Sequence, residues 1–378
     1  MNDAPARLRL GEGKISGALA TFLGLLAVGG VLCFLFPQYL TTAEFREQYP
    51  LATLRALLLG SIILSLAFGL TSILLSRRLS WGAPGILLGL LALAMGGSGV
   101  EVRDFEQSAL SISLDWLVID SLLLAAIFIP LELFLPQHRE QTKFHAEWKT
   151  DLTYFAISHL LVQFTAMAIR APATFLFGGG GLEPIQSWVR GLPALLALPL
   201  AMLVADLFQY TAHRIFHRVP LLWRFHSVHH SIHRIDWLAG SRLHFVDILL
   251  TRAFSYIPLY VLGFSASVFH AYVAIVALQA VAAHANTRLP FGLLKYALVT
   301  PQYHYWHHSD DPRFYDKNFA IHFPFIDKLF GTYFLPGNDW PASTGLGQVR
   351  FPKGYLHQFL FPFITDPKDA AVQQASER

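Results

Sequence analysis

The chain has 378 residues, of which 54% are hydrophobic and only 14% are charged, against roughly a quarter in a typical soluble domain. Its formal net charge is +3 and no basic tract stands out, so a nucleic-acid partner is not indicated. The single cysteine, Cys33, excludes an intrachain disulfide, a thiolate metal site and an iron–sulfur cluster. The chain has 17 histidines instead, so imidazole and carboxylate groups would have to hold any metal.

The N-terminal half consists mainly of apolar segments long enough to cross a membrane, which takes about 20 residues as a helix. The first segment follows three basic residues. At 22 residues it is longer than the apolar core of a signal peptide, and no small-residue cleavage site follows, so we expect a retained span. In the fourth segment, Asp120 is expected to face other helices rather than lipid. The predicted spans are residues 15–36, 53–75, 84–100, 116–135, 153–177 and 191–212.

A polar stretch rich in His and Arg, residues 213–245, separates these spans from a 38-residue apolar block, residues 246–283. The block is too long for one helix, and Pro258 and Gly263 near its middle predict a break. We therefore expect a hairpin of two helices that enters the membrane and returns to the same side. Residues 284–378 contain no further span, and the last dozen are typical of a disordered tail.

The basic residues of the predicted loops indicate an orientation. The loops on one side contain 8 Lys and Arg residues and those on the other side contain 3. By the positive-inside rule, the side with more basic residues is cytoplasmic. Counting forward through the spans places residues 213–245, His284 and the remaining tail on that same side. The topology therefore predicts that all the histidine-rich segments lie on the cytoplasmic face.

Three histidine patterns in these segments predict a metal site. Residues i, i+3 and i+4 share one face of an α-helix, so each pattern would point two or three imidazoles in one direction. The eight imidazoles together exceed what one four-coordinate zinc ion can use, which predicts two metal ions. The patterns are H-x3-H at His213 and His217, H-x2-H-H at His226, His229 and His230, and H-x2-H-H at His304, His307 and His308.

The identity of the metal is open from ligand type alone, because imidazole suits zinc, copper, iron and nickel. Scattered structural histidines and a zinc-binding surface are the alternative interpretations, but a repeated H-x2-H-H pattern is improbable by chance with 17 histidines in 378 residues. The patterns adjoin membrane spans, which indicates a lipid-soluble substrate. Attack on an unactivated C–H bond needs a metal that activates oxygen, which favours iron over redox-inert zinc.

The order of the patterns, with the long apolar hairpin before the last one, resembles the fatty acid hydroxylase superfamily, also called the sterol desaturase family. The segment from Asp206 to Arg214 looks like the family's approach to its first histidine box. The segments starting at Asp316 and Phe325, the latter ending at Tyr333, look like its closing region, and Trp148 to Asp151 resembles an upstream element. The resemblance covers roughly residues 140–340 and leaves residues 1–130 outside.

The resemblance implies a membrane enzyme with a non-haem pair of iron ions that hydroxylates, desaturates or demethylates lipids with oxygen and external electrons. Carried over to this chain, the eight histidines of the three patterns would be ligands. His284, 20 residues before His304, stands where the family often has a further ligand. Arg288 stands where some members have another histidine. His244 is a possible extra ligand or a partner of one. Asp206, Asp247 and Asn318 are possible partners that orient ligand imidazoles, and the alternative for Asp206 is a hydrogen bond between membrane helices.

These observations together predict an all-α integral membrane protein, a helical bundle with a cytoplasmic histidine-rich helical cap. Residues 1–130 would be N-terminal transmembrane helices, residues 131–340 the catalytic region and residues 341–378 a C-terminal tail. The predicted function is oxygen-dependent hydroxylation or desaturation of a membrane lipid by two iron ions. A separate reductase or small redox protein would supply electrons, since no dinucleotide or haem motif is present. The alternative is a non-oxidative metal protein, either a zinc-dependent membrane hydrolase or an inactive family member.

Overall fold

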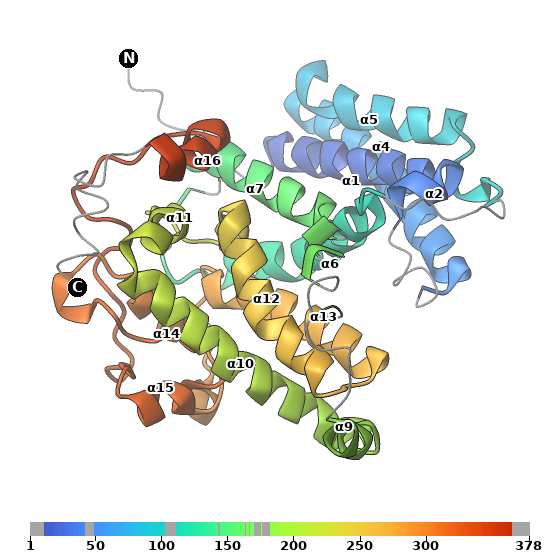
Figure 1. Cartoon of the computed structure of the whole chain (residues 1–378). Helices are drawn as coiled ribbons and strands as arrows, with labels where there is room; N and C mark the ends of the chain where they lie inside the picture. The colour runs from blue at the N-terminus through green and yellow to red at the C-terminus, as the bar shows by residue number, and fades with distance from the viewer. Residues whose placement is uncertain are drawn as a thin grey trace. The chain divides into compact units, whose positions relative to one another are not determined.

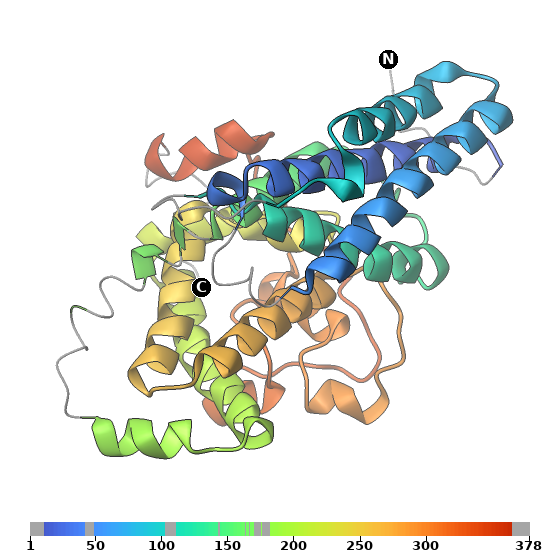
Figure 2. The same ribbon diagram turned by 90° about the vertical axis from the view of Figure 1, so that its right-hand side faces the viewer.

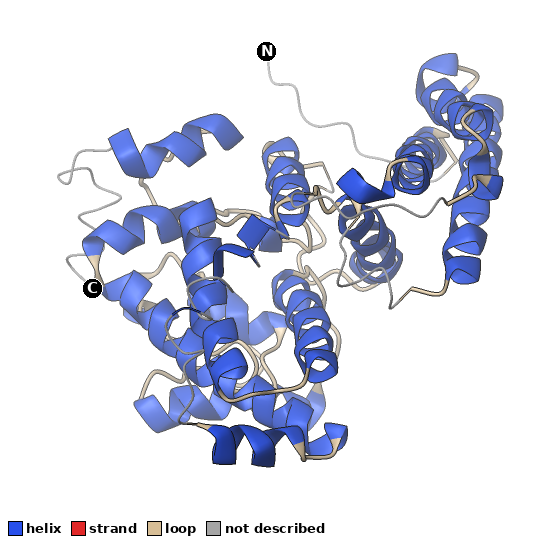
Figure 3. Ribbon diagram, turned by 45° about the vertical axis from the view of Figure 1, so that its right-hand side comes forward, coloured by secondary structure: helices blue, strands red, loops and turns tan. Residues whose placement is uncertain are grey.

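The structure is a computed structural model, and it describes residues 11–41, 49–102, 111–142, 144–162, 164–165, 167–169, 175 and 182–364. Within these ranges the regular structure is helical (Figure 3). Ser309 and Thr344 form one isolated β-bridge. The chain forms two compact units. The first comprises residues 1–126, 142–144 and 159–164, and the second comprises residues 127–141, 145–158 and 165–378.

The first unit is built on three long apolar helices that pack closely through small residues. The hydroxyl group of Ser65 in α4 donates a hydrogen bond that is shared by the carbonyl oxygens of Ala20 and Gly85, each 2.8 Å away. A Cβ on Gly85 would lie 2.4 Å from the Ala20 side chain, so only glycine permits this approach of α5 to α1. The elements are α1 Lys14–Leu35, α2 Pro37–Leu40, α4 Leu51–Ser76, α5 Leu79–Ala94, η1 Gly97–Gly99 and the first part of α6 Leu114–Phe134.

The second unit is organised around helix α10, and Figures 1 and 2 both show α12 and α13 beside it. Its alanines at positions 197, 201 and 205 are buried against Leu259 of α12 and Tyr272 of α13. The elements are α7 Trp148–Leu160, α9 Glu183–Arg190, α10 Ala194–Arg218, α11 Pro220–His230, η2 Ala239–Ser241, α12 Phe245–Val261, α13 Ala266–His284, η3 Gly292–Tyr296, α14 Pro301–His307, η4 Pro312–Phe314, α15 Pro324–Phe330 and α16 Tyr355–Ile364.

Six helices of the described residues are long and apolar enough to cross a membrane, which supports the predicted multi-pass membrane protein. Five of them correspond to predicted spans, and the sixth is α13. The predicted span 153–177 lies partly outside the described residues, and its described part begins with α7, a helix of only 13 residues. The six helices are Lys14–Leu35, Leu51–Ser76, Leu79–Gly99, Leu114–Phe134, Ala194–Arg218 and Ala266–His284.

The predicted break in the long apolar block is confirmed. Helix α12 has 17 residues and α13 has 19, and a short turn containing Gly263 at φ 78° separates them. Pro258 lies inside α12 and does not end it, because the helix continues to Val261. The left-handed conformation of Gly263, which glycine adopts without steric cost, is therefore the feature that closes the helix.

Candidate metal centre

The nine predicted ligand histidines all lie near the C-terminal ends of helices. His213 and His217 are in the last turns of α10, His229 and His230 end α11, and His284 ends α13. Helix α14 ends at His307, and His308 is its C-terminal cap. The C-terminus of a helix carries the negative end of the helix dipole, which stabilises a nearby cation. Four helix ends of this polarity therefore converge on the histidines.

The nine histidines form two groups. In each group the potential ligand atoms all lie within 4.8 Å of one another. The imidazole rings of His230 and His308, one from each group, are stacked with their centroids 4.6 Å apart, so the groups are adjacent. The first group is His213, His217, His226, His230 and His307, and the second group is His229, His284, His304 and His308.

Hydrogen bonds assign the protons of several rings. Nδ1 of His213 lies 2.9 Å from the carbonyl oxygen of Phe319, and Nδ1 of His226 lies 2.7 Å from a carboxylate oxygen of Asp247. These oxygens only accept, so each Nδ1 must carry the proton and each Nε2 of a neutral ring must be bare. The same reasoning applies to His284, because its Nδ1 lies 2.7 Å from the carbonyl oxygen of Ala280.

The bare nitrogens of His213 and His226 face each other, and that of His284 faces the Nε2 atoms of His304 and His229. Nε2 of His213 is 3.0 Å from Nε2 of His226, and Nε2 of His284 is 3.0 Å from that of His304 and 3.3 Å from that of His229. In the pair of His213 and His226, the two lone pairs repel at this distance unless a cation lies between them. Two nitrogens bound at right angles to one ion, each about 2.1 Å from it, are about 3 Å apart. The donor set therefore fits metal ions better than it fits a network of imidazole hydrogen bonds.

Four histidines outside the membrane helices are held neutral by burial. Burial, reinforced by neighbouring imidazoles, lowers the pKa of His229, His230, His304 and His308 well below the usual value of 6.5. Among the described residues, Nε2 of His230 and Nδ1 of His308 are buried without a hydrogen-bond partner. Unpaired buried nitrogens are costly in a protein interior, and a bound metal ion would satisfy them.

The segment 316–319 supplies partners to three ligand candidates of the first group. The carbonyl oxygen of Lys317 accepts a hydrogen bond from Nδ1 of His307 at 2.7 Å, and Phe319 does the same for His213. A carboxylate oxygen of Asp316 lies 3.5 Å from Nδ1 of His217. Sequence reasoning did not assign these partners, because two are backbone groups. The sequence signal that could have pointed to this segment was the run beginning at Asp316, which carries part of the family resemblance.

The predicted partner Asn318 supports this segment without touching a histidine ring nitrogen. Its amide donates to the carbonyl oxygens of Tyr303 and Phe334, at 2.9 and 2.7 Å, and its oxygen accepts from the backbone N–H of Phe334. Asn318 and Asp316 both have left-handed backbones, at φ 61° and 56°. Asn and Asp tolerate this conformation better than other side chains, which explains their place in this turn. Of the three predicted orienting residues, only Asp247 contacts a ligand candidate directly.

Asp206 has a different role from either predicted one. Its carboxylate accepts hydrogen bonds from the backbone N–H groups of Ile321, His322 and Phe323, at 2.8, 3.0 and 2.7 Å. It therefore contacts no imidazole nitrogen and joins no second helix through a side chain. Instead it fixes the chain directly after Phe319, whose carbonyl oxygen orients His213, so its effect on the site is indirect.

His244 is not in either group, and the prediction that it is an extra ligand is not supported. Its Nδ1 accepts a hydrogen bond from the backbone N–H of Val246 at 3.1 Å, so it is the N-cap of α12. Its Nε2 must then carry the proton, and it lies 3.0 Å from the carbonyl oxygen of Phe359. No lone pair of the neutral ring remains for a metal.

Two further positions bear on the second group. Arg288, which stands where a further family ligand was considered, is exposed, and the group has four histidines without it. Gly240 in η2 lies against His284, and a Cβ at position 240 would be 3.1 Å from Nδ1 of that ring. The absence of a side chain there lets the backbone cover the imidazole, a feature that sequence reasoning missed.

The fold and the site define a class: a multi-pass helical membrane protein with two adjacent groups of buried histidines that could hold metal ions. Comparison with known proteins gives a match to one family model. Residues 198–332 match the family model described as fatty acid hydroxylase, and this match spans all three histidine patterns. This match confirms the predicted resemblance to the family over the segment that carries the histidine patterns.

Three relatives illustrate the similarity. Ornithine lipid hydroxylase OlsE of Rhizobium tropici is 34% identical over 47% of this chain and 53% of its own length. Alkylglycerol monooxygenase of Danio rerio is 33% identical over 37% of this chain and 31% of its own length. Very-long-chain aldehyde decarbonylase GL1-1 of Oryza sativa subsp. japonica is 29% identical over 49% of this chain and 31% of its own length. The match thus spans about half or less of each relative, and no solved structure gives a significant match.

Proposed function

We propose that this chain is an oxygen-dependent lipid hydroxylase that holds two iron ions, one in each group of histidines. The observation that carries the proposal is the set of buried imidazoles whose ring nitrogens converge in two adjacent groups. Two of the relatives are, by name, a hydroxylase of ornithine lipid and a monooxygenase of alkylglycerol, which favours hydroxylation over desaturation. A lipid substrate also agrees with the six candidate spans.

The bound iron ions would supply the activation of oxygen and the attack on a C–H bond. The protein's own residues would set the position and the basicity of the ligands. Asp247 accepts a hydrogen bond from Nδ1–H of His226, which fixes the tautomer and makes the lone pair of Nε2 a stronger metal ligand. The carbonyl oxygens of Phe319, Lys317 and Ala280 fix three more rings. The burial of all nine rings keeps water away from the reacting region.

The source of the electrons and the membrane face on which the histidines lie are parts of the same proposal. The sequence has no dinucleotide fingerprint, haem motif or cysteine cluster, so a separate reductase or small redox protein would deliver the electrons. The excess of Lys and Arg in the loops on the histidine side supports placing the histidines on the cytoplasmic face.

Metal analysis of the purified protein tests the proposal. We expect close to two iron ions per chain in protein produced with ample iron, and oxygen consumption when that protein is reduced. Elemental analysis and an oxygen electrode make these measurements. Stoichiometric zinc without oxygen uptake under the same conditions would contradict the proposal and support the non-oxidative alternative.

A further inference from the structure

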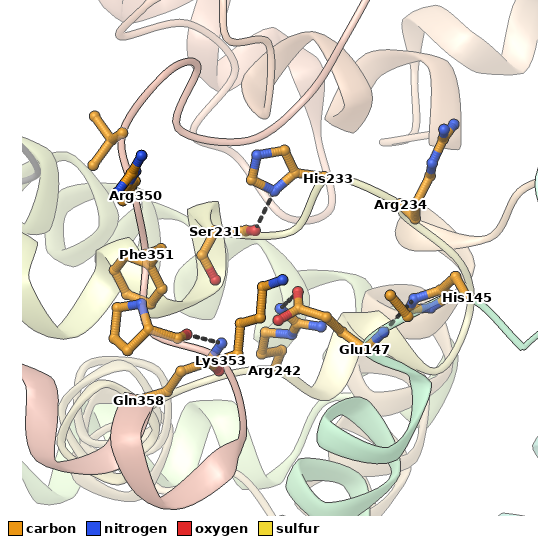
Figure 4. A pocket seen from close by; sticks show the side chains of 13 residues that line it. His145, Glu147, Ser231, His233, Arg234, Arg242, Arg350, Phe351, Lys353 and Gln358 are labelled. Atoms are coloured by element: carbon orange, nitrogen blue, oxygen red, sulfur yellow. Dashed lines mark hydrogen bonds and ion pairs between the residues drawn. The ribbon is translucent and has the colours of Figure 1, made fainter. Parts of the chain in front are cut away.

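A cavity of about 550 Å³ lies beside the histidine groups but includes none of the nine ligand candidates. Figure 4 shows that its side chains come from three segments, around His145, around Ser231 to Arg242, and around Val349 to Gln358. Ser231 follows His230 directly, and the carbonyl oxygen of Arg242 lies 3.2 Å from Nδ1 of His229. The cavity is therefore a separate space next to the metal centre.

The charge of this cavity is strongly positive. Its lining includes four cationic side chains, and Glu147 is its one carboxylate. Glu147 is already paired with Arg242, 2.9 Å away, and Asp151 also pairs with Arg242. No carboxylate of the described residues pairs with the other three cations, which are exposed at the cavity. These are Arg234, Arg350 and Lys353.

A buried acceptor also lines the cavity. The Gln358 side chain is 1% exposed, and its amide nitrogen donates to the carbonyl oxygen of Pro352 at 2.9 Å. Its amide oxygen has no hydrogen-bond partner among the described residues. A ligand that satisfies this cavity would therefore combine an anionic group for the cations with a hydroxyl or ammonium donor for this oxygen.

Helix α16, which follows the cavity segment, presents an apolar face to the outside of the second unit. Leu356, Leu360, Phe363 and Ile364 are 63%, 42%, 59% and 76% exposed, and their spacing of four, three and one places them on one side of the helix. The opposite side, with Gln358 and the residues at positions 361 and 362, is buried. An amphipathic helix with basic residues beside it is typical of a helix that lies in a membrane surface.

The neighbours of α16 agree with this position. Phe363 contacts Phe225 of α11, with ring centroids 5.6 Å apart, and α11 begins two residues after the candidate span α10 ends. The carbonyl oxygen of Phe359 lies 3.0 Å from Nε2 of His244, the residue before the apolar hairpin starts at α12. Helix α16 is thus attached where one membrane segment ends and another begins.

We propose that the cavity binds the anionic headgroup of a membrane lipid, while the apolar face of α16 lies against the acyl chains. Arg350 and Lys353 precede α16 by only a few residues, so a lipid held in the surface by this helix would bring its headgroup to these cations. The site is separate from the histidines and does not depend on the proposed reaction. It can be tested without measuring turnover.

Lipid retention by the full-length purified chain tests the headgroup site. Native mass spectrometry compares phosphatidylglycerol, which is anionic and has free hydroxyls, with phosphatidylcholine of the same acyl chains. We expect preferential retention of phosphatidylglycerol. The variants Arg350→Gln and Lys353→Gln should each weaken it about fivefold, the effect expected for one cation near an anionic lipid surface. The matched control is Arg313→Gln, an exposed cation outside the cavity, which should change nothing.

Two outcomes would overturn the headgroup assignment. The first is equal retention of both lipids, or retention of phosphatidylglycerol that neither cavity variant weakens. The second is stabilisation of the protein by inorganic phosphate alone, in a thermal-unfolding assay, to the same extent as by phosphatidylglycerol. The second outcome would show a site for a free anion rather than for a lipid.

Spin labelling tests the position of α16. Cys33 is the single native cysteine, so Leu356→Cys in a Cys33→Ser background gives one label on the apolar face. In phosphatidylglycerol vesicles, we expect this label to be more accessible to oxygen than to a water-soluble nickel chelate. A label at Arg313→Cys, on an exposed polar segment, should show the reverse preference. If both labels prefer the nickel chelate, α16 does not lie in the membrane surface.

Discussion

At the scale of single residues, the site depends on the different partners of the two nitrogens in an imidazole ring. One ring nitrogen faces the group, and in several rings the other donates to a fixed oxygen, as in His213, His226 and His284. The outer hydrogen bond determines which nitrogen is bare, and this nitrogen is the potential metal ligand. A change to a ligand and a change to its outer partner should therefore have different effects.

Removal of a ligand should remove metal without unfolding the membrane helices. His307 belongs to the group of five, and its Nδ1 is held by the carbonyl oxygen of Lys317. We expect His307→Ala to lose most of the iron of this group while the protein still inserts into the membrane, as measured by elemental analysis of membrane-extracted protein. The control is His357→Ala, an exposed histidine outside both groups, which should keep its iron. Full iron content in His307→Ala would show that His307 is not a ligand.

Removal of an outer partner should weaken binding rather than abolish it. Asp247→Asn removes the negative charge that lies 2.7 Å from Nδ1 of His226. We expect the iron affinity to fall roughly 10- to 100-fold, the usual effect of losing a carboxylate partner of a ligand histidine, in a titration with a competing chelator. Asp311→Asn, on a half-buried carboxylate that pairs with Arg313 and lies outside both groups, serves as the control. An unchanged affinity in Asp247→Asn would assign Asp247 a purely structural role.

At the scale of elements, the site depends on where helices end. Helices α10, α11, α13 and α14 all bring their C-terminal turns to the histidines. Their dipoles add a negative potential that favours a cation. The short helix η2 then covers His284, and this contact is close because position 240 is glycine.

A side chain at position 240 should disturb the second group. The Cβ of Gly240→Ala would lie 3.1 to 3.2 Å from atoms of His284, so this ring must shift by a few tenths of an ångström. We expect faster loss of one of the two iron ions to a mild chelator, followed by elemental analysis over time. Gly60→Ala, where an added Cβ meets nothing within 4 Å, should lose iron at the wild-type rate. Equal rates in the two variants would mean that the contact with His284 has no effect on binding.

At the scale of the whole molecule, the nine histidines belong to the second unit and connect segments that are far apart in sequence. His213 and Phe319, for example, are 106 residues apart. The first unit has its own core around Ala27, Ile62 and Ala92 and contains none of the nine histidines. Bound metal should therefore stabilise the second unit specifically.

Removal of metal should lower the stability of the second unit. A ligand that binds only the folded state raises stability by about 2.7 kcal/mol at 100 times its dissociation constant. We expect a chelator to lower the thermal midpoint of the second unit and to increase hydrogen exchange in α11 and α14. Exchange in α1 and α4 should not change. Equal increases in both units would contradict a metal site confined to the second unit.

The sequence by itself determined most of the long apolar helices, where the long block breaks, and which nine histidines to consider. These features are local, because helical spacing and apolar length depend on neighbouring residues. Only the tertiary structure decided how the histidines divide. His229 and His230 are adjacent in the chain but belong to different groups, since successive residues of a helix point in different directions. The outer partners, and the roles of Asp206 and His244, depend on contacts between segments separated by up to 117 residues, which no local pattern encodes.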